Sequence, residues 1–292
     1  MATSARVAAR PRAPAFGEIG KILRRELLNL VLLIGAVAML GPFLWMVFTS
    51  LKRPDEAVRL PITFLPDNLL NFTNYQTIFA TMPVGRFLLN STIVTILGVI
   101  PSLVLSALAG YAFAKLEFPG KEVCFISILA VLMLPFEVTF LPLYIVFSKF
   151  GLINTYVGIA APEVFSPLGI FLMRQFMQSI PNDYLDAGRI DGTGELELFW
   201  RIAAPLMKPA LLTLTIIKFI FSWNSFLWPL VMTRDESMMT LTVGLANLGN
   251  EFYVEYTTLT AAAAITVVPI LILYFILQRQ VMQGMIGSGV KG

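Results

Sequence analysis

The densest group of charged side chains lies between Ile180 and Leu211. Elsewhere charge is scarce, because 13% of the 292 residues are charged and 57% are hydrophobic, whereas soluble domains are about 25% charged. We therefore expect lipid to surround most of the chain, and this segment to face water or a partner, so that it could serve as a docking surface. Its five acids and three bases are Asp183, Asp186, Asp191, Glu195, Glu197, Arg189, Arg201 and Lys208.

The chain lacks the residue types on which most acid–base and metal chemistry depends. It has no histidine, and its one cysteine, Cys124, excludes an internal disulfide. A metalloenzyme or a triad hydrolase is therefore disfavoured, and we predict no catalytic residue, no metal ligand and no cofactor bound by this chain. The net charge of +3 is too small and too dispersed for a nucleic-acid surface.

Three ionisable residues fall inside apolar runs, where their burial in lipid is costly and points to a function. Glu137 and Lys218 are candidates for lining a solute pathway. Glu163 lies between Pro162 and Pro167 in a short apolar run. For this residue we favour an ion pair across helices or a position near the membrane interface.

The run WNSFLWPL, from Trp223 to Leu230, combines aromatic rings with an amide. Sugars present flat C–H faces and rings of hydroxyl groups, so their sites combine stacking aromatic side chains with amides. This interpretation makes Trp223, Asn224, Phe226 and Trp228 candidates for the solute pathway. An aromatic belt at the membrane interface explains the same run equally well.

The charged segment has the pattern of a helix, a turn and a second helix. The first helix is expected over Pro181–Ile190, because proline suits a first helical turn, and Gly192 and Gly194 suit its close. Gly192 is expected to have a positive φ or a partner backbone pressed against it. The second helix is expected over Glu195–Ala204, ended by Pro205.

One face of the first helix is expected to dock a partner. Tyr184, Gly188 and Asp191 fall on adjoining parts of one helical face. Ala187 and Gly188 also leave room beside Asp186 for another backbone or side chain to approach closely.

Six apolar stretches are long enough to cross a bilayer, which takes about 20 residues. We therefore predict an all-α integral membrane protein with six spans, and a cytoplasmic helical coupling loop at 180–208 between the fourth and the fifth. Pro135 and Pro142 are expected to bend the third span. The predicted spans are 27–51, 87–114, 123–148, 156–176, 209–233 and 257–278.

The distribution of basic residues predicts the orientation. With six spans both ends lie on one side, and lysine and arginine are more numerous in the segments on that side. We therefore expect both termini to be cytoplasmic, with a basic disordered tail over residues 1–26 and a short tail over 281–292. The polar segment from Lys52 to Arg86, rich in proline, is expected to be an outer loop with little long helix.

The charged segment resembles the cytoplasmic EAA loop of permease subunits in binding-protein-dependent ABC importers. The residues that match are Asp186-Ala187-Gly188, Asp191-Gly192, Ile202, Pro205 and Pro209. The family usually has glutamate in place of Asp186 and alanine in place of Gly188. In that family the loop is a short helical elbow seated in a groove of the ATPase subunit. The resemblance therefore implies ATPase coupling by Tyr184, Asp186, Ala187, Gly188, Asp191 and Gly192.

More of the chain shares this resemblance, which covers nearly everything after residue 40. The chain is similar to the carbohydrate-uptake branch, and within it to the shorter permease subunit of maltose-type importers. The matching stretches are PFLWMVFTSLK at 42–52, NFTNY at 71–75, FPGK at 118–121, LPLYIVFSKFGLINT at 141–155, WNSFLWPL at 223–230, TLTVGL at 240–245 and the tail at 278–292.

The resemblance implies an importer of a sugar or related solute in the bacterial cytoplasmic membrane. ATP and Mg²⁺ would bind a separate ATPase subunit, because the segment Gly17–Lys21 lacks the first glycine and the Ser/Thr of a phosphate-binding loop. The implied partners are a second permease subunit in a heterodimer, two ATP-binding subunits or domains, an extracytoplasmic solute-binding protein and the lipid bilayer. No nucleic acid is expected.

Two alternatives stay open. Within the same family, Lys218 could offer its positive charge to a solute of the glycerol-phosphate type. In a different class, the chain would be a proton-coupled secondary transporter, which the lack of histidine and of an obvious inverted repeat disfavours. A membrane enzyme is disfavoured because the sequence has no clustered catalytic set.

Overall fold

The computed structural model describes residues 16–250 and 255–289, and every element in those ranges is helical. Three of the helices are long: α1 (Phe16–Ser50), α4 (Val84–Lys115) and α15 (Tyr256–Gly289). Each contains a stretch long and apolar enough to cross a membrane, over 23–50, 84–115 and 256–278. These stretches coincide with the first, second and sixth predicted spans.

Three further stretches pass the same length and composition test only as helix pairs with a sharp bend between their members. Counted as one span each, the three pairs bring the number of candidate spans to six at most. The pairs are α5 (Lys121–Val131) with α6 (Phe136–Lys149), bent by 99°; α7 (Tyr156–Val164) with α8 (Pro167–Gln178), bent by 41°; and Glu195–Leu206 with α12 (Lys208–Trp223), bent by 77°.

Three predicted spans are therefore not continuous helices, and the fourth is interrupted between Val164 and Pro167. The third breaks before Pro135, which precedes the first residue of α6, because a proline cannot donate the hydrogen bond that would continue a helix. The fifth was expected to run over 209–233, but α12 ends at Trp223, and the short helix α13 (Leu227–Met232) follows after three residues.

Both predicted tails are shorter than expected. The basic segment over 1–26, which was expected to be disordered, is helical from Phe16 onward. Its last proline is Pro14, and the residues that follow it are helix formers, so α1 can begin there. At the other end α15 continues to Gly289, through most of the tail expected over 281–292. Residues 1–15 and 290–292 lie outside the described ranges.

The segment between α1 and α4, which was expected to be an outer loop, has little long helix, as predicted. It contains α2 (Pro54–Ala57) and α3 (Thr73–Thr81), of four and nine residues. The Lys52 side chain is buried beneath it and donates to the carbonyl of Thr63. The buried amide of Asn74 donates to the carbonyls of Ser50 and Lys52, at 2.7 and 2.8 Å. These bonds fix the loop to the end of α1.

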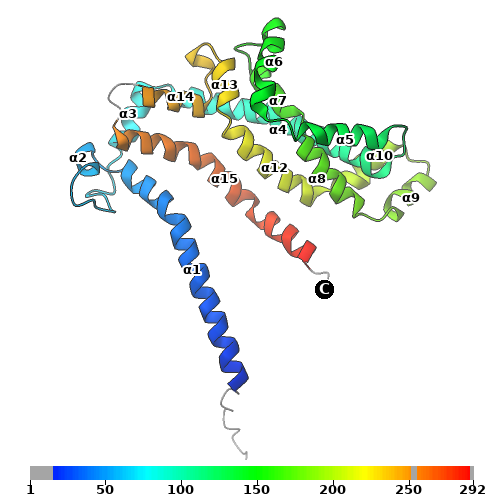
Figure 1. Cartoon of the computed structure of the whole chain (residues 1–292), viewed down its shortest axis with the longest axis horizontal. Coiled ribbons are helices and arrows are strands. Elements are labelled where there is room, and N and C mark those ends of the chain that lie inside the picture. The colour runs from blue at the N-terminus through cyan, green and yellow to red at the C-terminus, as the bar shows by residue number, and fades with distance from the viewer. Residues whose placement is uncertain (1–15, 251–254, 290–292) are drawn as a thin grey trace, which may run out of the picture.

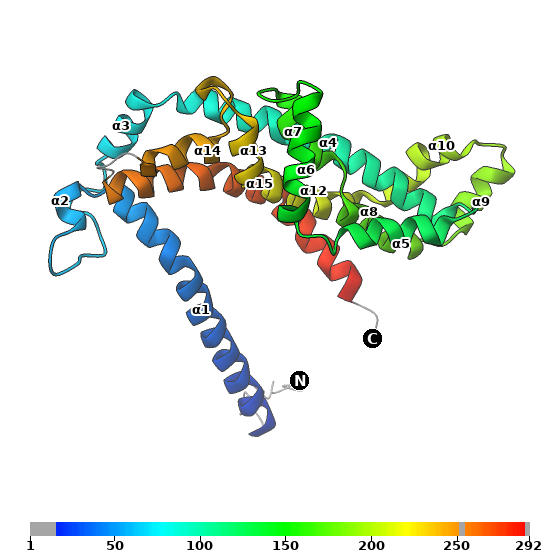
Figure 2. The same ribbon diagram turned by 45° about the horizontal axis from the view of Figure 1, so that its top comes forward.

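The body of the molecule is elongated, with α4, α8, α12 and α15 along its length (Figure 1). The loop with α2 and α3 lies at one end, and α9 (Asp183–Ile190) and α10 (Glu195–Leu198) lie at the other. Helix α1 leaves the body as a rod in both ribbon views (Figures 1 and 2), and no residue in the most apolar part of this helix is buried.

The remaining elements are short helices. They are η1 (Phe199–Ala203), α11 (Ala204–Leu206), η2 (Glu236–Met238), α14 (Leu241–Ala246) and η3 (Asn247–Asn250).

Candidate functional site

The first candidate site is the elbow, which we define as Asp183–Leu206. Its first helix, α9, starts two residues later than predicted and ends at Ile190 as expected. Its second helical part runs through α10, η1 and α11 to Leu206. The prediction that Pro205 ends this part at Ala204 is wrong, because Pro205 stands in the first turn of α11, where its missing N–H is not needed.

The turn of the elbow depends on Gly192, whose φ is +78°. The Gly192 N–H donates to the carbonyl of Arg189, and the Thr193 N–H donates to the carbonyl of Gly188, both at 3.0 Å. This left-handed conformation satisfies the last carbonyls of α9 and favours glycine. The predicted positive φ is confirmed.

Ion pairs hold the two arms of the elbow together. The guanidinium of Arg189 contacts the carboxylate of Asp186 at 2.9 Å within α9 and that of Glu195 at 2.8 Å across the turn. Hydrogen bonding to Glu195, and to a lesser extent to Asp186, raises the pKa of Arg189 above its ordinary value. The guanidinium therefore stays charged and keeps both carboxylates in place.

The elbow is also fastened to the end of α4. The Tyr111 hydroxyl donates to Glu195 at 2.5 Å. The Lys115 ammonium donates to the carbonyl of Ile180 at 2.5 Å and to the side chain of Asn182 at 2.7 Å. A displacement of the elbow would therefore pull on α4, which packs against α7, α8 and α12 in the middle of the molecule.

The predicted docking face is only partly correct. Gly188 faces inward, and a Cβ added there would lie 2.4 Å from the Cδ2 atom of Leu198. The small size of Gly188 therefore lets the second arm of the elbow, not a partner, approach α9. The other predicted coupling residues are exposed: Tyr184, Asp186, Ala187, Asp191 and Gly192.

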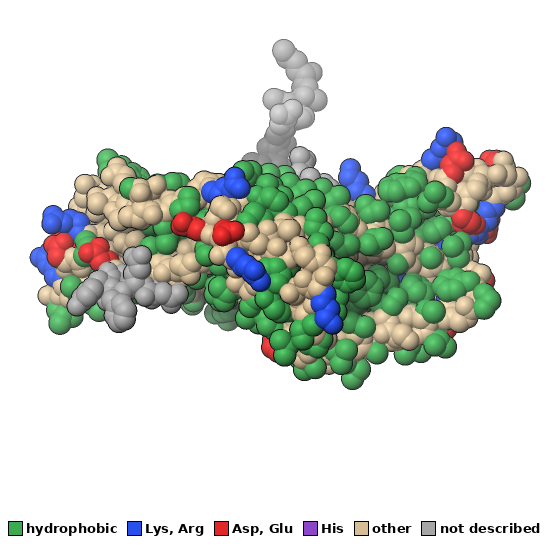
Figure 3. Space-filling model, turned by 90° about the horizontal axis from the view of Figure 1, so that it is seen from above, with side chains coloured by type: hydrophobic (Ala, Val, Ile, Leu, Met, Phe, Trp, Pro, Cys, Tyr) green, Lys and Arg blue, Asp and Glu red, His purple; other side chains and the backbone are tan. Residues whose placement is uncertain are grey.

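Large apolar side chains are exposed on the same elbow. Tyr184 and Trp200 are 56% and 53% exposed, and Ile190 and Leu196 are also exposed. Figure 3 shows the charged side chains of this end of the molecule beside a largely hydrophobic face. Apolar residues rimmed by charge are typical of a protein–protein contact.

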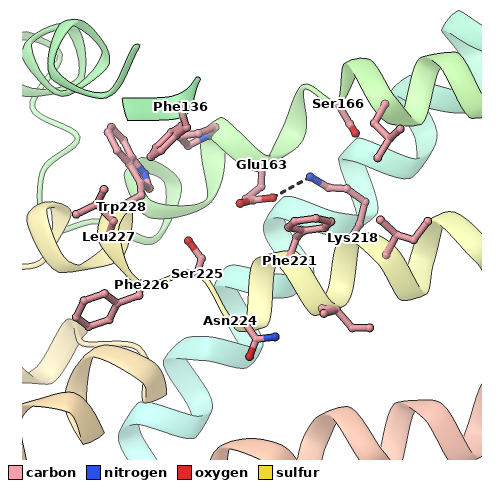
Figure 4. A pocket seen from close by; sticks show the side chains of 14 residues that line it. Phe136, Glu163, Ser166, Lys218, Phe221, Asn224, Ser225, Phe226, Leu227 and Trp228 are labelled. Atoms are coloured by element: carbon pink, nitrogen blue, oxygen red, sulfur yellow. Dashed lines mark hydrogen bonds and ion pairs between the residues drawn. The ribbon is translucent and has the colours of Figure 1, made fainter. Parts of the chain in front are cut away.

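The second candidate site is a pocket of about 570 Å³ where three helix breaks meet, the one before α6, the one between α7 and α8, and the one after α12. Phe136 begins α6, Glu163 and Ser166 flank the break between α7 and α8, and Asn224 follows the end of α12. Figure 4 shows these side chains around the pocket. The lining residues are Phe136, Pro162, Glu163, Ser166, Leu168, Ile217, Lys218, Ile220, Phe221, Asn224, Ser225, Phe226, Leu227 and Trp228.

Lys218 and Glu163 form an ion pair in this pocket. The Lys218 ammonium lies 2.8 Å from the Glu163 carboxylate, and the side chains are 11% and 24% exposed. Of the two alternatives expected for Glu163, the structure shows the ion pair across helices. Pairing reduces the cost of holding either charge within the membrane region.

The structure divides the aromatic run into two parts. Asn224, Phe226 and Trp228 line the pocket, whereas Trp223 does not. Trp223 is buried, stacks on Phe219 and donates its indole N–H to the carbonyl of Thr266 in α15. Trp223 therefore lies outside this pocket and points from α12 toward α15.

Trp228 has a fixed orientation at the edge of the pocket. Its indole N–H donates to the carbonyl of Gly158 at 3.1 Å. The rings of Phe136, Phe140 and Phe147 surround it edge-on, with Phe147 nearest at a centroid distance of 5.4 Å. A side chain held in this way presents one edge to the pocket and does not move freely into it.

Glu137, the other predicted pathway residue, does not line the pocket. It is exposed in the first turn of α6. The sequence analysis missed Phe136, Ser166, Phe221 and Ser225, which do line it. Ser166 carried a local signal, since a serine before a proline is a typical helix start, and here it caps α8 by accepting from the Gly169 N–H at 3.1 Å.

The carboxylates of the elbow do not converge on a metal site. In the part of the chain that the structure describes, no group of three or more histidine, cysteine, aspartate or glutamate residues could hold a metal ion.

Comparison with known proteins gives close relatives. The arabinooligosaccharides transport system permease protein AraQ of Halalkalibacterium halodurans is 37% identical over 253 residues, which cover 86% of this chain and 91% of that protein. The sn-glycerol-3-phosphate transport system permease protein UgpE of Yersinia pestis bv. Antiqua is 31% identical over 268 residues, 89% and 95% of the two chains.

Solved structures share the fold. A bacterial ABC transporter involved in the import of the acidic polysaccharide alginate matches with a TM-score of 0.77 and 24% identity, over 92% of this chain and 99% of that one. A chain of the alginate transporter in complex with an alginate pentasaccharide-bound periplasmic protein matches with a TM-score of 0.54 and 15% identity, over 89% and 97%.

The family described as the binding-protein-dependent transport system inner membrane component matches residues 102–287, which include the elbow and the pocket. This chain belongs to that family, whose relatives include the permease subunits of sugar ABC transporters.

Proposed function

We propose that this chain is the permease subunit of an ATP-driven importer that moves a sugar or a related polyol across the cytoplasmic membrane. The observation that carries the proposal is the pocket where three spans break. Discontinuous helices form solute sites in transporters, because their free backbone groups can line a cavity. The aromatic rings of Phe221 and Phe226, with the amide of Asn224 and the hydroxyl groups of Ser166 and Ser225, suit a sugar.

The energy for import would come from ATP and Mg²⁺ on a separate subunit. The elbow would be its docking element, with the exposed residues Tyr184, Asp186 and Asp191 on the contact surface. Closure of the ATPase subunits would move the elbow as a rigid body, and its bonds to Tyr111 and Lys115 would carry that motion into α4. The pocket would then open alternately to the two sides of the membrane.

The remaining partners follow from the same proposal. A second permease subunit would complete the membrane assembly. An extracytoplasmic protein would deliver the solute, by analogy with the alginate transporter in complex with an alginate pentasaccharide-bound periplasmic protein. Both termini and the elbow would lie in the cytoplasm, in agreement with the distribution of basic residues.

A solute of the glycerol-phosphate type is the second candidate. It is favoured by the similarity to UgpE and by the cation of Lys218 in the pocket. The identity to AraQ is higher, and the aromatic lining suits a sugar ring better than a small phosphate ester.

The test is uptake by the purified assembly in vesicles. We expect ATP-dependent uptake of at least one member of a panel of neutral radiolabelled di- and trisaccharides, and slower uptake of sn-glycerol 3-phosphate. Vesicles that contain a proton gradient but no ATP serve as the control. Uptake driven by the gradient alone would contradict the proposal and favour a secondary transporter.

A further inference from the structure

The ion pair in the pocket has a role beyond structural pairing. Lys218 and Glu163 both line the pocket, and Figure 4 shows the ammonium and the carboxylate directed toward each other. They are the two charged residues among the fourteen that line it, and the other polar side chains there are the neutral Ser166, Asn224 and Ser225. The lining as a whole therefore carries no net charge.

The position of Glu163 is closely defined by the packing of its helix. A Cβ added to Gly98 in α4 would lie 2.9 Å from the Cβ of Glu163. The absence of a side chain at Gly98 therefore lets α7 approach α4, and this approach places the Glu163 carboxylate opposite Lys218 on α12. The carboxylate is less buried than the ammonium it contacts, at 24% against 11% exposure.

Loss of either charge would leave the other uncompensated in a partly desolvated space, where charges interact more strongly than in water. An uncompensated Lys218 would attract anions. In the intact pair, an anion that approaches the ammonium also meets the neighbouring carboxylate, which repels it. We propose that Glu163 determines the specificity of this pocket by neutralising Lys218, so that the site takes uncharged polyhydroxylated solutes and disfavours phosphorylated or uronic ones. The inference rests on the proposed function, since it names the class of solute for the same pocket.

The charge of the pocket can be measured without knowing the solute. Asn224→Cys, in a Cys124→Ser background that removes the chain's one native cysteine, places a thiol at the pocket. The probes are two methanethiosulfonates of similar size, the anionic sulfonatoethyl reagent and the cationic trimethylammonium-ethyl reagent. The quantity compared is the ratio of the anionic to the cationic labelling rate, measured on the assembled complex.

We expect Glu163→Gln to raise this ratio by about tenfold or more, because an unpaired ammonium remains. Lys218→Met should lower it by a similar factor, and the double variant should return it to the parental value. A ratio that stays unchanged in all three variants would show that the pair does not set the electrostatic potential of the pocket, which would overturn the inference. If Glu163→Gln fails to assemble, Lys218→Met alone tests the same claim in the opposite direction.

Uptake by complexes that keep the native Asn224, with and without Glu163→Gln, separates this inference from the proposed function. If the parental complex takes up no neutral saccharide with ATP, the proposed function fails even where the labelling ratio responds as expected. If the parental complex transports saccharides but Glu163→Gln leaves the labelling ratio unchanged, the inference fails and the proposed function stands.

Discussion

The elbow and the pocket use charge in opposite ways. In the elbow the charges are numerous and half-exposed, and Arg189 joins Asp186 and Glu195 into a network that fixes the angle between two short arms. In the pocket a single pair is surrounded by aromatic and aliphatic side chains. Charge thus shapes a surface at the elbow, whereas in the pocket it sets the electrostatic character of a cavity.

The two regions also differ in how far apart their residues lie in the sequence. The arms of the elbow come from one short segment, so their geometry depends on a turn. The pocket joins residues that the sequence separates widely, from Phe136 to Trp228. A change at the elbow should therefore uncouple transport from ATP hydrolysis, while a change in the pocket should alter affinity for solute.

The largest effect is expected from Gly192→Asp. The φ of +78° costs a residue with a side chain about 1–2 kcal/mol, and the new carboxylate would stand beside Asp191. Beyond Gly192 and its two neighbours in the chain, no heavy atom lies within 4 Å of the added Cβ. In this chain the cost therefore comes from backbone strain and charge repulsion. We expect solute-stimulated ATP hydrolysis and uptake to fall together by about 5- to 30-fold, measured on the reconstituted complex.

The matched control is Gly194→Asp, two residues along the same turn. Gly194 has a φ of −71°, lies in open space and precedes α10, where aspartate is a favourable helix cap. Uptake should stay near the parental rate. Equal loss in both variants would show that added charge, rather than the left-handed turn, is responsible, and parental uptake by Gly192→Asp with the ATPase still bound would show that the elbow does not couple.

An intermediate effect is expected in the pocket. Asn224→Ala should raise the KM for solute about 2- to 10-fold, because one hydrogen bond contributes about 0.5–1.5 kcal/mol, while basal ATP hydrolysis stays measurable. Trp223→Phe is the control from the same run. It removes the bond to Thr266 outside the pocket, so it should lower thermal stability without changing KM. If Trp223→Phe shifted the KM and Asn224→Ala did not, Trp223 and not Asn224 would be the residue that contacts the solute.

The smallest effect is expected at the junction of the elbow with α4. Tyr111→Phe removes the hydrogen bond to Glu195 and retains the ring that packs on Phe199. We expect about a twofold rise in ATP hydrolysed per solute imported, with assembly unchanged. An unaltered ratio would indicate that the elbow moves α4 through packing alone.

The sequence predicted the elbow better than the pocket for a physical reason. The positive φ of Gly192 and the end of α9 depend on neighbouring residues, so local patterns were sufficient. The inward direction of Gly188 depends on Leu198 across the turn, and local periodicity could not give it. The pairing of Glu163 was foreseen from the cost of burial, but its partner Lys218 lies on another helix and was identified only by the packing.

Trp223 shows the limit of residue type as a guide. Aromatic and amide residues in one run suggested a common site, yet the break after α12 turns Trp223 toward α15 and Trp228 toward Phe147. Neighbours in sequence on either side of a helix break need not share a face. Pro135 was expected to bend the third span, but the break after α12 was not expected, and no local pattern showed where the breaks would meet.

The ion pair of the pocket also has a consequence for how the protein is made. Lys218 follows Glu163 by 55 residues, so at the ribosome's rate of about 5–20 residues per second it is added roughly 3–11 seconds later. During that interval the α7–α8 pair would enter the bilayer without its counter-ion, and an unpaired charge there is costly. The charge of Glu163 is thus compensated only when α12 arrives, which makes the order of synthesis part of how the pocket acquires its neutrality.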